Sequence, residues 1–148
     1  VLSRRSLLDL DPSLNSTHGG NPLCCAATLA SLEVIEEQNL VSESERKGKL
    51  MFKHLQKLQK KYEKIIKTIQ GKGLVAAIHI INPITNQLDS RMGDEIIEKC
   101  MQKGLLMVRT GTGTIKIGPT LIIPDDAMLE GIAVIDEVLA QICMDAKN

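Results

Sequence analysis

The segment Ser16-Thr17-His18-Gly19-Gly20-Asn21-Pro22 runs directly into a long apolar stretch. Its two glycines let the backbone turn sharply, Asn21 is a good helix cap, and Pro22 suits the first helical turn, where no N–H is needed. The segment therefore predicts a junction from loop to helix. Such a junction suits a phosphate, because helix amides and a positive dipole end lie beside the hydroxyls of Ser16 and Thr17. On these residues alone, an ordinary capped helix start is the simpler explanation.

The apolar stretch that follows predicts a helix from Leu23 to about Gln38. Up to Leu32 this helix is apolar or small on nearly every face. A helix without a polar side has to be covered over most of its circumference. We therefore expect it to lie between two bodies of protein, with its polar end at residues 33–39 in solvent.

Together, residues 16–35 resemble the segment STxGGNPLxxAAxLAxLEVI of the class III aminotransferases. These are pyridoxal-phosphate enzymes of fold type I, related to ornithine, acetylornithine and 4-aminobutyrate aminotransferases. Further matches follow in the family's order at residues 71–74, 104–106, 115–119 and 121–123. The resemblance thus extends over nearly the whole chain.

Length and composition narrow the class of protein. The 148 residues can bury a core and fit one domain, and 18 basic residues balance 18 acidic ones. Without a basic block, and with one Phe and one Tyr, the chain is not expected to bind nucleic acid. No apolar run is long enough to span a membrane and no signal peptide is visible, so we expect a cytoplasmic protein.

The first residue, Val1, is not an initiator methionine and stands within an apparent strand. We therefore expect the chain to be the C-terminal portion of a longer protein. The family's arrangement implies three parts: residues 1–21 as the end of the large cofactor-binding domain with its phosphate loop, 22–39 as an interdomain helix, and 40–148 as the small C-terminal α/β domain.

Hydrophobic periodicity predicts the elements of that small domain. A helix over residues 42–62 has a seam of residues spaced by three and four, and its lysine-rich opposite face indicates a solvated surface rather than a membrane-binding one. Its seam consists of Val41, Ser44, Gly48, Met51, Leu55, Leu58 and Tyr62. The small Ser44 and Gly48 are expected to let a neighbouring element approach closely.

Strands are predicted within residues 65–81, on either side of Gly71-Lys72-Gly73, and at 105–108 and 114–117 around a glycine-rich hairpin turn. A helix capped by Ser90 runs to Gly104, with Met92, Ile96, Cys100 and Met101 as its stripe. A last helix begins at Pro124 and has a buried stripe of Met128, Ile132, Ile135, Leu139 and Ile142. These elements predict a two-layer α/β sandwich, in which helices pack on a small, mostly antiparallel sheet.

No set of side chains in the chain has the pattern of a self-contained catalytic centre. The four cysteines lack paired metal-ligand spacing, and we expect all four to be reduced core residues. His79, inside an apolar strand, is expected to be a packed or edge histidine rather than a ligand.

The resemblance implies a role in a shared active site. Thr17, with Ser16, matches the residues that reach the phosphate of pyridoxal 5'-phosphate in the opposite subunit, which implies a homodimer. The Schiff-base lysine of the family would lie upstream of Val1, so the chain alone is expected to be inactive. The implied reaction moves an amino group from an amino acid or an ω-amine to a 2-oxo acid.

Three positions depart from the family pattern. Lys116 stands where an arginine usually holds the substrate α-carboxylate, and a lysine offers only a point charge instead of a bidentate grip. Lys116 is therefore either a carboxylate contact or structural, with Arg109 as a candidate replacement. Gln70 replaces an arginine before the Gly-x-Gly, and Thr120 replaces a second proline after Pro119.

Two further interpretations stay open. The chain is alternatively a non-catalytic α/β module that assembles with a partner and is indifferent to pyridoxal phosphate. The parent protein is alternatively an aminomutase or racemase of the same fold, which dependence on an amino acceptor would distinguish from a transaminase.

Overall fold

The computed structural model describes residue 17 and residues 19–145. The expectations for residues 1–16, among them the site residue Ser16, lie outside the described residues. The chain divides into two compact units, with the boundary between Leu40 and Val41. The predicted division at 1–21, 22–39 and 40–148 stays a prediction.

The first unit contains the helix α2 (Pro22–Glu37). Its start has the predicted form: the side chain of Asn21 accepts a hydrogen bond from the Leu23 amide at 3.0 Å, and Pro22 is the first helical residue. The expected burial is wrong for this chain, because none of the helix residues is buried and Leu23 is 81% exposed. Among its described residues, the first unit has no second element that could cover the helix.

The expectation for the cysteines is wrong at two positions for the same reason. Cys24 and Cys25 lie on α2 and are exposed. Cys100 is buried in the second unit, as predicted, and Cys143 is half-buried there.

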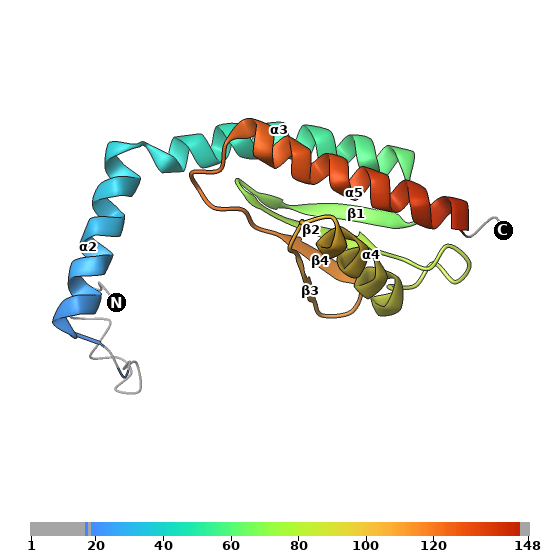
Figure 1. Cartoon of the computed structure of the whole chain (residues 1–148), viewed down its shortest axis with the longest axis horizontal. Coiled ribbons are helices and arrows are strands. Elements are labelled where there is room, and N and C mark those ends of the chain that lie inside the picture. Colours follow the sequence, from blue (N-terminus) through green and yellow to red (C-terminus); the bar gives the residue numbers. More distant parts are fainter. Residues whose placement is uncertain (1–16, 18, 146–148) are drawn as a thin grey trace. The chain divides into compact units, whose positions relative to one another are not determined.

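The second unit is a four-stranded sheet with three helices packed on one face (Figure 1). The strand order is β1-β2-β4-β3, and every neighbouring pair is antiparallel. The strands are β1 (Ile66–Lys72), β2 (Val75–Ile80), β3 (Val108–Thr110) and β4 (Thr114–Ile117). The helices are α3 (Leu40–Lys61), α4 (Ser90–Gln102) and α5 (Asp125–Asp145). The predicted two-layer α/β fold is thereby confirmed.

Helix α3 packs through the predicted seam, apart from its first residue. Met51 and Leu55 are completely buried, whereas Val41 is 76% exposed, so its inclusion in the seam was wrong. Gly48 lies against the turn between β1 and β2: a Cβ atom there would lie 2.4 Å from the carbonyl oxygen of Gly73. The small residues of the seam therefore allow the close approach expected of them.

Two predicted boundaries are corrected. The cap of α4 is Asp89 instead of Ser90, because the Asp89 carboxylate accepts a hydrogen bond from the Met92 amide at 3.0 Å. The strand predicted at 105–108 begins only at Val108, so residues 105–107 precede β3. The predicted stripe of α4 is also wrong at Met101, which is exposed. The stripe of α5 is buried at all five predicted positions, with Val138 added.

No helix in the described residues combines the length and the apolar character needed to cross a bilayer.

Candidate functional site

The loop before α2 leaves Thr17 exposed. Gly20 has a φ of +79°, and nothing lies within 4 Å of the position that a Cβ atom would take there. The first turn of α2 carries no acidic residue. A hydroxyl, open space and the positive end of a helix are compatible with a phosphate, so the described part of this loop fits the phosphate of pyridoxal phosphate.

The start of α2 offers fewer free amide groups to an anion than its sequence indicates. Pro22 has no N–H, and the amide of Leu23 is already bonded to the side chain of Asn21. Because these two positions offer no free amide, contacts to an anion would come mainly from the loop, with the Thr17 hydroxyl among them.

The second unit has a sheet face that its helices do not cover. Along each strand, side chains alternate between the core and this open face. The pairing of the strands aligns four open-face residues in one row across the sheet: Gln70 opposite Ala77, Ala77 opposite Lys116, and Lys116 opposite Val108. Two positions that depart from the family pattern, Gln70 and Lys116, thus lie in the same row.

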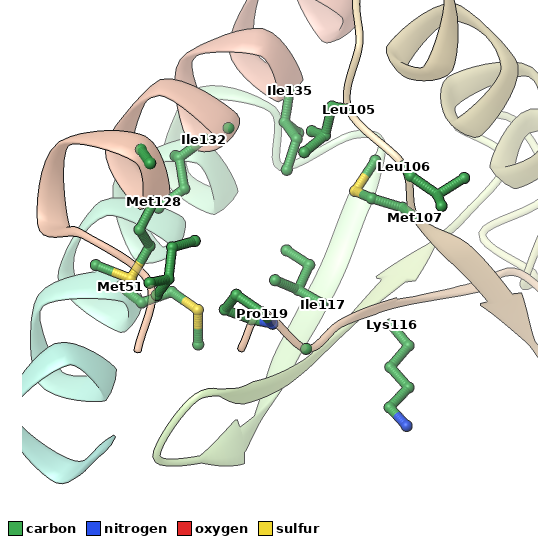
Figure 2. A pocket seen from close by; sticks show the side chains of 14 residues that line it. Met51, Leu105, Leu106, Met107, Lys116, Ile117, Pro119, Met128, Ile132 and Ile135 are labelled. Atoms are coloured by element: carbon green, nitrogen blue, oxygen red, sulfur yellow. The ribbon is translucent and has the colours of Figure 1, made fainter. Parts of the chain in front are cut away.

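Lys116 is exposed in the middle of this face. Within residues 19–145 it takes part in no ion pair or side-chain hydrogen bond. Figure 2 shows its amine directed away from the apolar side chains of the neighbouring hollow. Its ammonium is therefore available to an anion that approaches the open face.

Arg109 lies on the other face of the sheet from Lys116. In β3 it pairs with Ile115, a core residue, so it belongs to the side of the sheet on which the helices pack. Its guanidinium forms an ion pair with Asp94 of α4 and donates a hydrogen bond to the Gly111 carbonyl at 2.6 Å. The structure does not bring Arg109 and Lys116 together, and the suggested substrate role of Arg109 stays a prediction.

A second row lies beside the first and consists of Thr68, His79, Thr114 and Thr110. His79 Nδ1 and Thr114 Oγ1 are 3.1 Å apart, so the half-buried histidine is held by a hydrogen bond across the strands. Neither row contains a carboxylate. These two rows therefore combine one lysine with the hydrogen-bonding groups of a glutamine, a histidine and three threonines.

The segment after Lys116 is held by a residue that sequence reasoning missed. Lys47 of α3 is only 8% exposed, and its ammonium donates hydrogen bonds to the carbonyls of Ile123 at 2.8 Å and Leu121 at 3.4 Å. A signal was present, because Lys47 stands three residues after Ser44 and four before Met51, within the seam.

A salt bridge next to Lys47 also ties α3 to the start of α5. The guanidinium of Arg46 donates to both carboxylate oxygens of Asp125 at 2.8 and 2.9 Å and also contacts Glu43. These hydrogen bonds to Arg46 lower the pKa of the Asp125 and Glu43 carboxyl groups. The path from β4 to α5 is thus fixed at both Lys47 and Arg46.

An apolar hollow of about 130 Å³ lies between α3, α5 and the end of β4 (Figure 2). Its lining is aliphatic and sulfur-containing, with Met51, Met107, Ile117, Pro119, Met128 and Ile132 among the residues. Among the described residues that line it, Lys116 is the one that carries a charge, and its amine is turned away. The hollow offers no group for acid–base chemistry.

Comparison with known proteins gives one consistent result. The family model "Aminotransferase class-III" matches residues 6–139. The chain is 34% identical to an ornithine aminotransferase of Emericella nidulans over 96% of its own length and 30% of that protein's. It is also 34% identical to an acetylornithine aminotransferase of Caldanaerobacter subterraneus subsp. tengcongensis, over 86% of this chain and 30% of that protein.

Solved structures agree. The acetylornithine aminotransferase from Elizabethkingia anophelis superimposes with a TM-score of 0.76 and 31% identity, over 86% of this chain and 30% of that one. The chain thus spans about 30% of the length of the curated relatives that it matches.

Proposed function

The chain belongs to the class-III aminotransferase family, and we propose that it is part of a pyridoxal-phosphate-dependent enzyme that moves an amino group from an amino acid or amine to a 2-oxo acid. The observation that carries the proposal is the family match over residues 6–139. Because the chain spans about 30% of its relatives, it would supply only some of the groups at such a site.

In this proposal Thr17 holds the phosphate of the cofactor. Thr17 is exposed, the first turn of α2 carries no acidic residue, and a hydroxyl is a suitable donor to a phosphate oxygen. When bound, pyridoxal phosphate acts as an electron sink for the substrate carbon. The family resemblance implies that this phosphate belongs to the opposite subunit of a homodimer, and in this proposal Thr17 would complete its partner's site.

Lys116 is the proposed contact for a substrate carboxylate. The open sheet face presents its ammonium without a competing carboxylate in either row. An ammonium attracts a carboxylate as a point charge and orients it less strictly than a guanidinium does. Binding and orientation of the substrate are thus the contribution that the second unit would make.

The test uses the complete gene product, purified with and without the substitution Thr17→Val. We expect Thr17→Val to weaken binding of pyridoxal phosphate by about 10- to 100-fold, because a hydrogen bond to a charged group contributes roughly 1.5–3 kcal/mol. Cofactor absorbance, titrated at equilibrium, measures the affinity, and transfer from amino donors to 2-oxo acids measures the activity.

The matched control is Thr28→Val. The Thr28 hydroxyl donates to the Cys24 carbonyl within α2 at 2.7 Å and has no proposed contact with the cofactor. Cofactor affinity should therefore stay at the wild-type value. The proposal fails if Thr17→Val also leaves the affinity unchanged, or if no donor supports transfer. Turnover that needs no 2-oxo acid would instead indicate a mutase or racemase.

A further inference from the structure

We propose that Gln70 and Lys116 form a single, two-part carboxylate site on the open face of the sheet, with Ala77 as its floor. This inference rests on the proposed function, in which Lys116 contacts a substrate carboxylate. It adds Gln70 as a residue that determines which carboxylates are bound.

Strand pairing places the two residues correctly for this role. Gln70 of β1 and Lys116 of β4 are both opposite Ala77 of β2, on either side of it. Neighbouring strands lie about 4.8 Å apart, so the two backbone positions are separated by roughly 10 Å. Both side chains are long and exposed, whereas the methyl group of Ala77 leaves the space between them open.

The charges on this face favour an anion. Neither row of the open face carries a carboxylate, and His79 in the second row is engaged with Thr114. The hydrogen bond from Lys49 is the main cause that lowers the pKa of the Glu45 carboxyl group, and the charge of Lys72, the other lysine on this face, adds to that effect. Among the described residues Lys116 forms no ion pair, so no acidic partner neutralises its charge there.

The chemistry of the two side chains is complementary. A carboxylate has two oxygens that accept hydrogen bonds, and an arginine can donate to both from one group. Here the Lys116 ammonium would donate to one oxygen and the Gln70 carboxamide N–H to the other. Because the donors come from two strands, each residue alone gives only a one-point contact.

The same charge implies a preference among substrates. An α-amino acid carries its own ammonium next to the carboxylate, and Lys116 repels that charge at short range. An ω-amino acid carries its ammonium several carbons away, where the repulsion is weaker. Val108, the next residue in the row, offers an apolar contact for the intervening carbon chain.

The test is a titration of the 148-residue chain, followed by NMR, with two isomers. In 5-aminovalerate the carboxylate is remote from the amine, and in L-norvaline the two are adjacent. We expect saturable shifts of the Gln70 side-chain amide and the Ala77 methyl group, with 5-aminovalerate binding more tightly. The amide 5-aminopentanamide, which keeps the amine but lacks the carboxylate, should cause no saturable shift.

Substitutions then identify the two parts. Gln70→Leu and Lys116→Met should each weaken binding of 5-aminovalerate about tenfold, as expected for loss of a hydrogen bond to a charged group, and the double variant should add little. The controls Gln56→Leu and Lys53→Met change the same residue types on the exposed face of α3 and should leave the affinity unchanged.

Three results would overturn the inference: no saturable shift in the wild-type chain, an unchanged affinity in Gln70→Leu, or norvaline binding as tightly as its isomer. The last result would assign the site to α-carboxylates. No cofactor is present in this experiment, so its outcome is independent of whether the complete gene product transfers amino groups.

Discussion

Helices α2 and α3 differ in whether their apolar side chains are buried. Helix α2 is apolar or small over most of its length, yet none of its residues is buried. Helix α3 is rich in lysine and glutamate, yet Met51 and Leu55 are completely buried on it. The difference shows that a one-sided stripe can be covered by a single sheet, whereas an apolar circumference needs several surrounding surfaces.

The largest effect that should separate these two regions is the reactivity of their thiols. Cys24 and Cys25 on α2 are exposed, whereas Cys100 is buried, and burial raises the pKa of the Cys100 thiol to about 11. We expect a disulfide reagent at pH 8 to modify the α2 thiols at least ~10³-fold faster, since reaching Cys100 requires unfolding that costs about 5 kcal/mol or more. The double variant Cys100→Ser/Cys143→Ser keeps only the two α2 thiols, and the triple variant Cys24→Ser/Cys25→Ser/Cys143→Ser keeps only Cys100. Stopped-flow labelling of these two variants measures the two rates separately.

Slow labelling of Cys24 and Cys25 would show that these thiols are covered and would contradict the difference between α2 and α3. If dilution of the chain restored the fast rate, copies of the chain would be covering α2 in solution.

A second test removes the same side chain from each helix. Leu55→Ala should lower the free energy of unfolding of the second unit by about 2–5 kcal/mol, because it leaves a cavity at a fully buried position. Leu29→Ala, at a position that is 57% exposed, should change it by less than about 0.5 kcal/mol. Urea denaturation followed by NMR signals of the sheet reports both values, and equal losses would show that α2 is packed after all.

A third test concerns the close contact between Gly48 in the α3 seam and the backbone of Gly73. Gly48→Ala should destabilise the second unit by about 1–3 kcal/mol, because the new methyl group would meet the backbone of Gly73 at 2.4 Å. Its control is Gly131→Ala in α5, where the nearest atom is the flexible end of Leu105 at 3.3 Å. The control should be neutral or slightly stabilising, since alanine favours a helix. Thermal unfolding of both variants distinguishes the seam from an ordinary helical glycine.

The smallest effect concerns the helix caps. Asp89→Ala should cost about 1 kcal/mol of the stability of the second unit, whereas Asn21→Ala, at the cap of α2, should leave it unchanged. The Met92 amide lowers the pKa of Asp89, so the folded state favours the charged carboxylate.

The pH dependence of this cap has a definite sign. Its stabilisation is complete above the unfolded pKa of about 3.9 and is lost as the pH falls through the lower pKa of the folded state. Asp89→Asn keeps the hydrogen bond and should remove that part of the acid dependence. Urea denaturation between pH 2 and 6 tests this, and an unaltered acid profile in Asp89→Asn would contradict the assignment of the cap.

Much of the fold could be predicted from local patterns. The stripe of α5 was predicted at Met128, Ile132, Ile135, Leu139 and Ile142, and all five are buried, because helical periodicity depends only on spacing along the chain. The cap of α4 was misassigned to Ser90, since Asp89 and Ser90 are both good capping residues and only backbone geometry separates them.

The candidate site shows the limit of such reasoning more clearly. Thr17, Lys116 and Gln70 were each singled out from their sequence context, but no spacing indicates that Gln70 and Lys116 share a row. That relation depends on β2 lying between β1 and β4 and on an irregularity in the pairing between Ile66 and Thr68. A shift of one residue would send either side chain to the opposite face.

The sequence by itself determined the family, the two-layer fold and the positions of most helices and strands, because these follow from motifs and from periodicity along the chain. Only the tertiary structure decided which residues meet across strands, that Lys47 is buried on the carbonyls of Leu121 and Ile123, and that Arg109 and Lys116 lie on opposite faces of the sheet. These relations join residues far apart in the chain, and they are set by strand order and register.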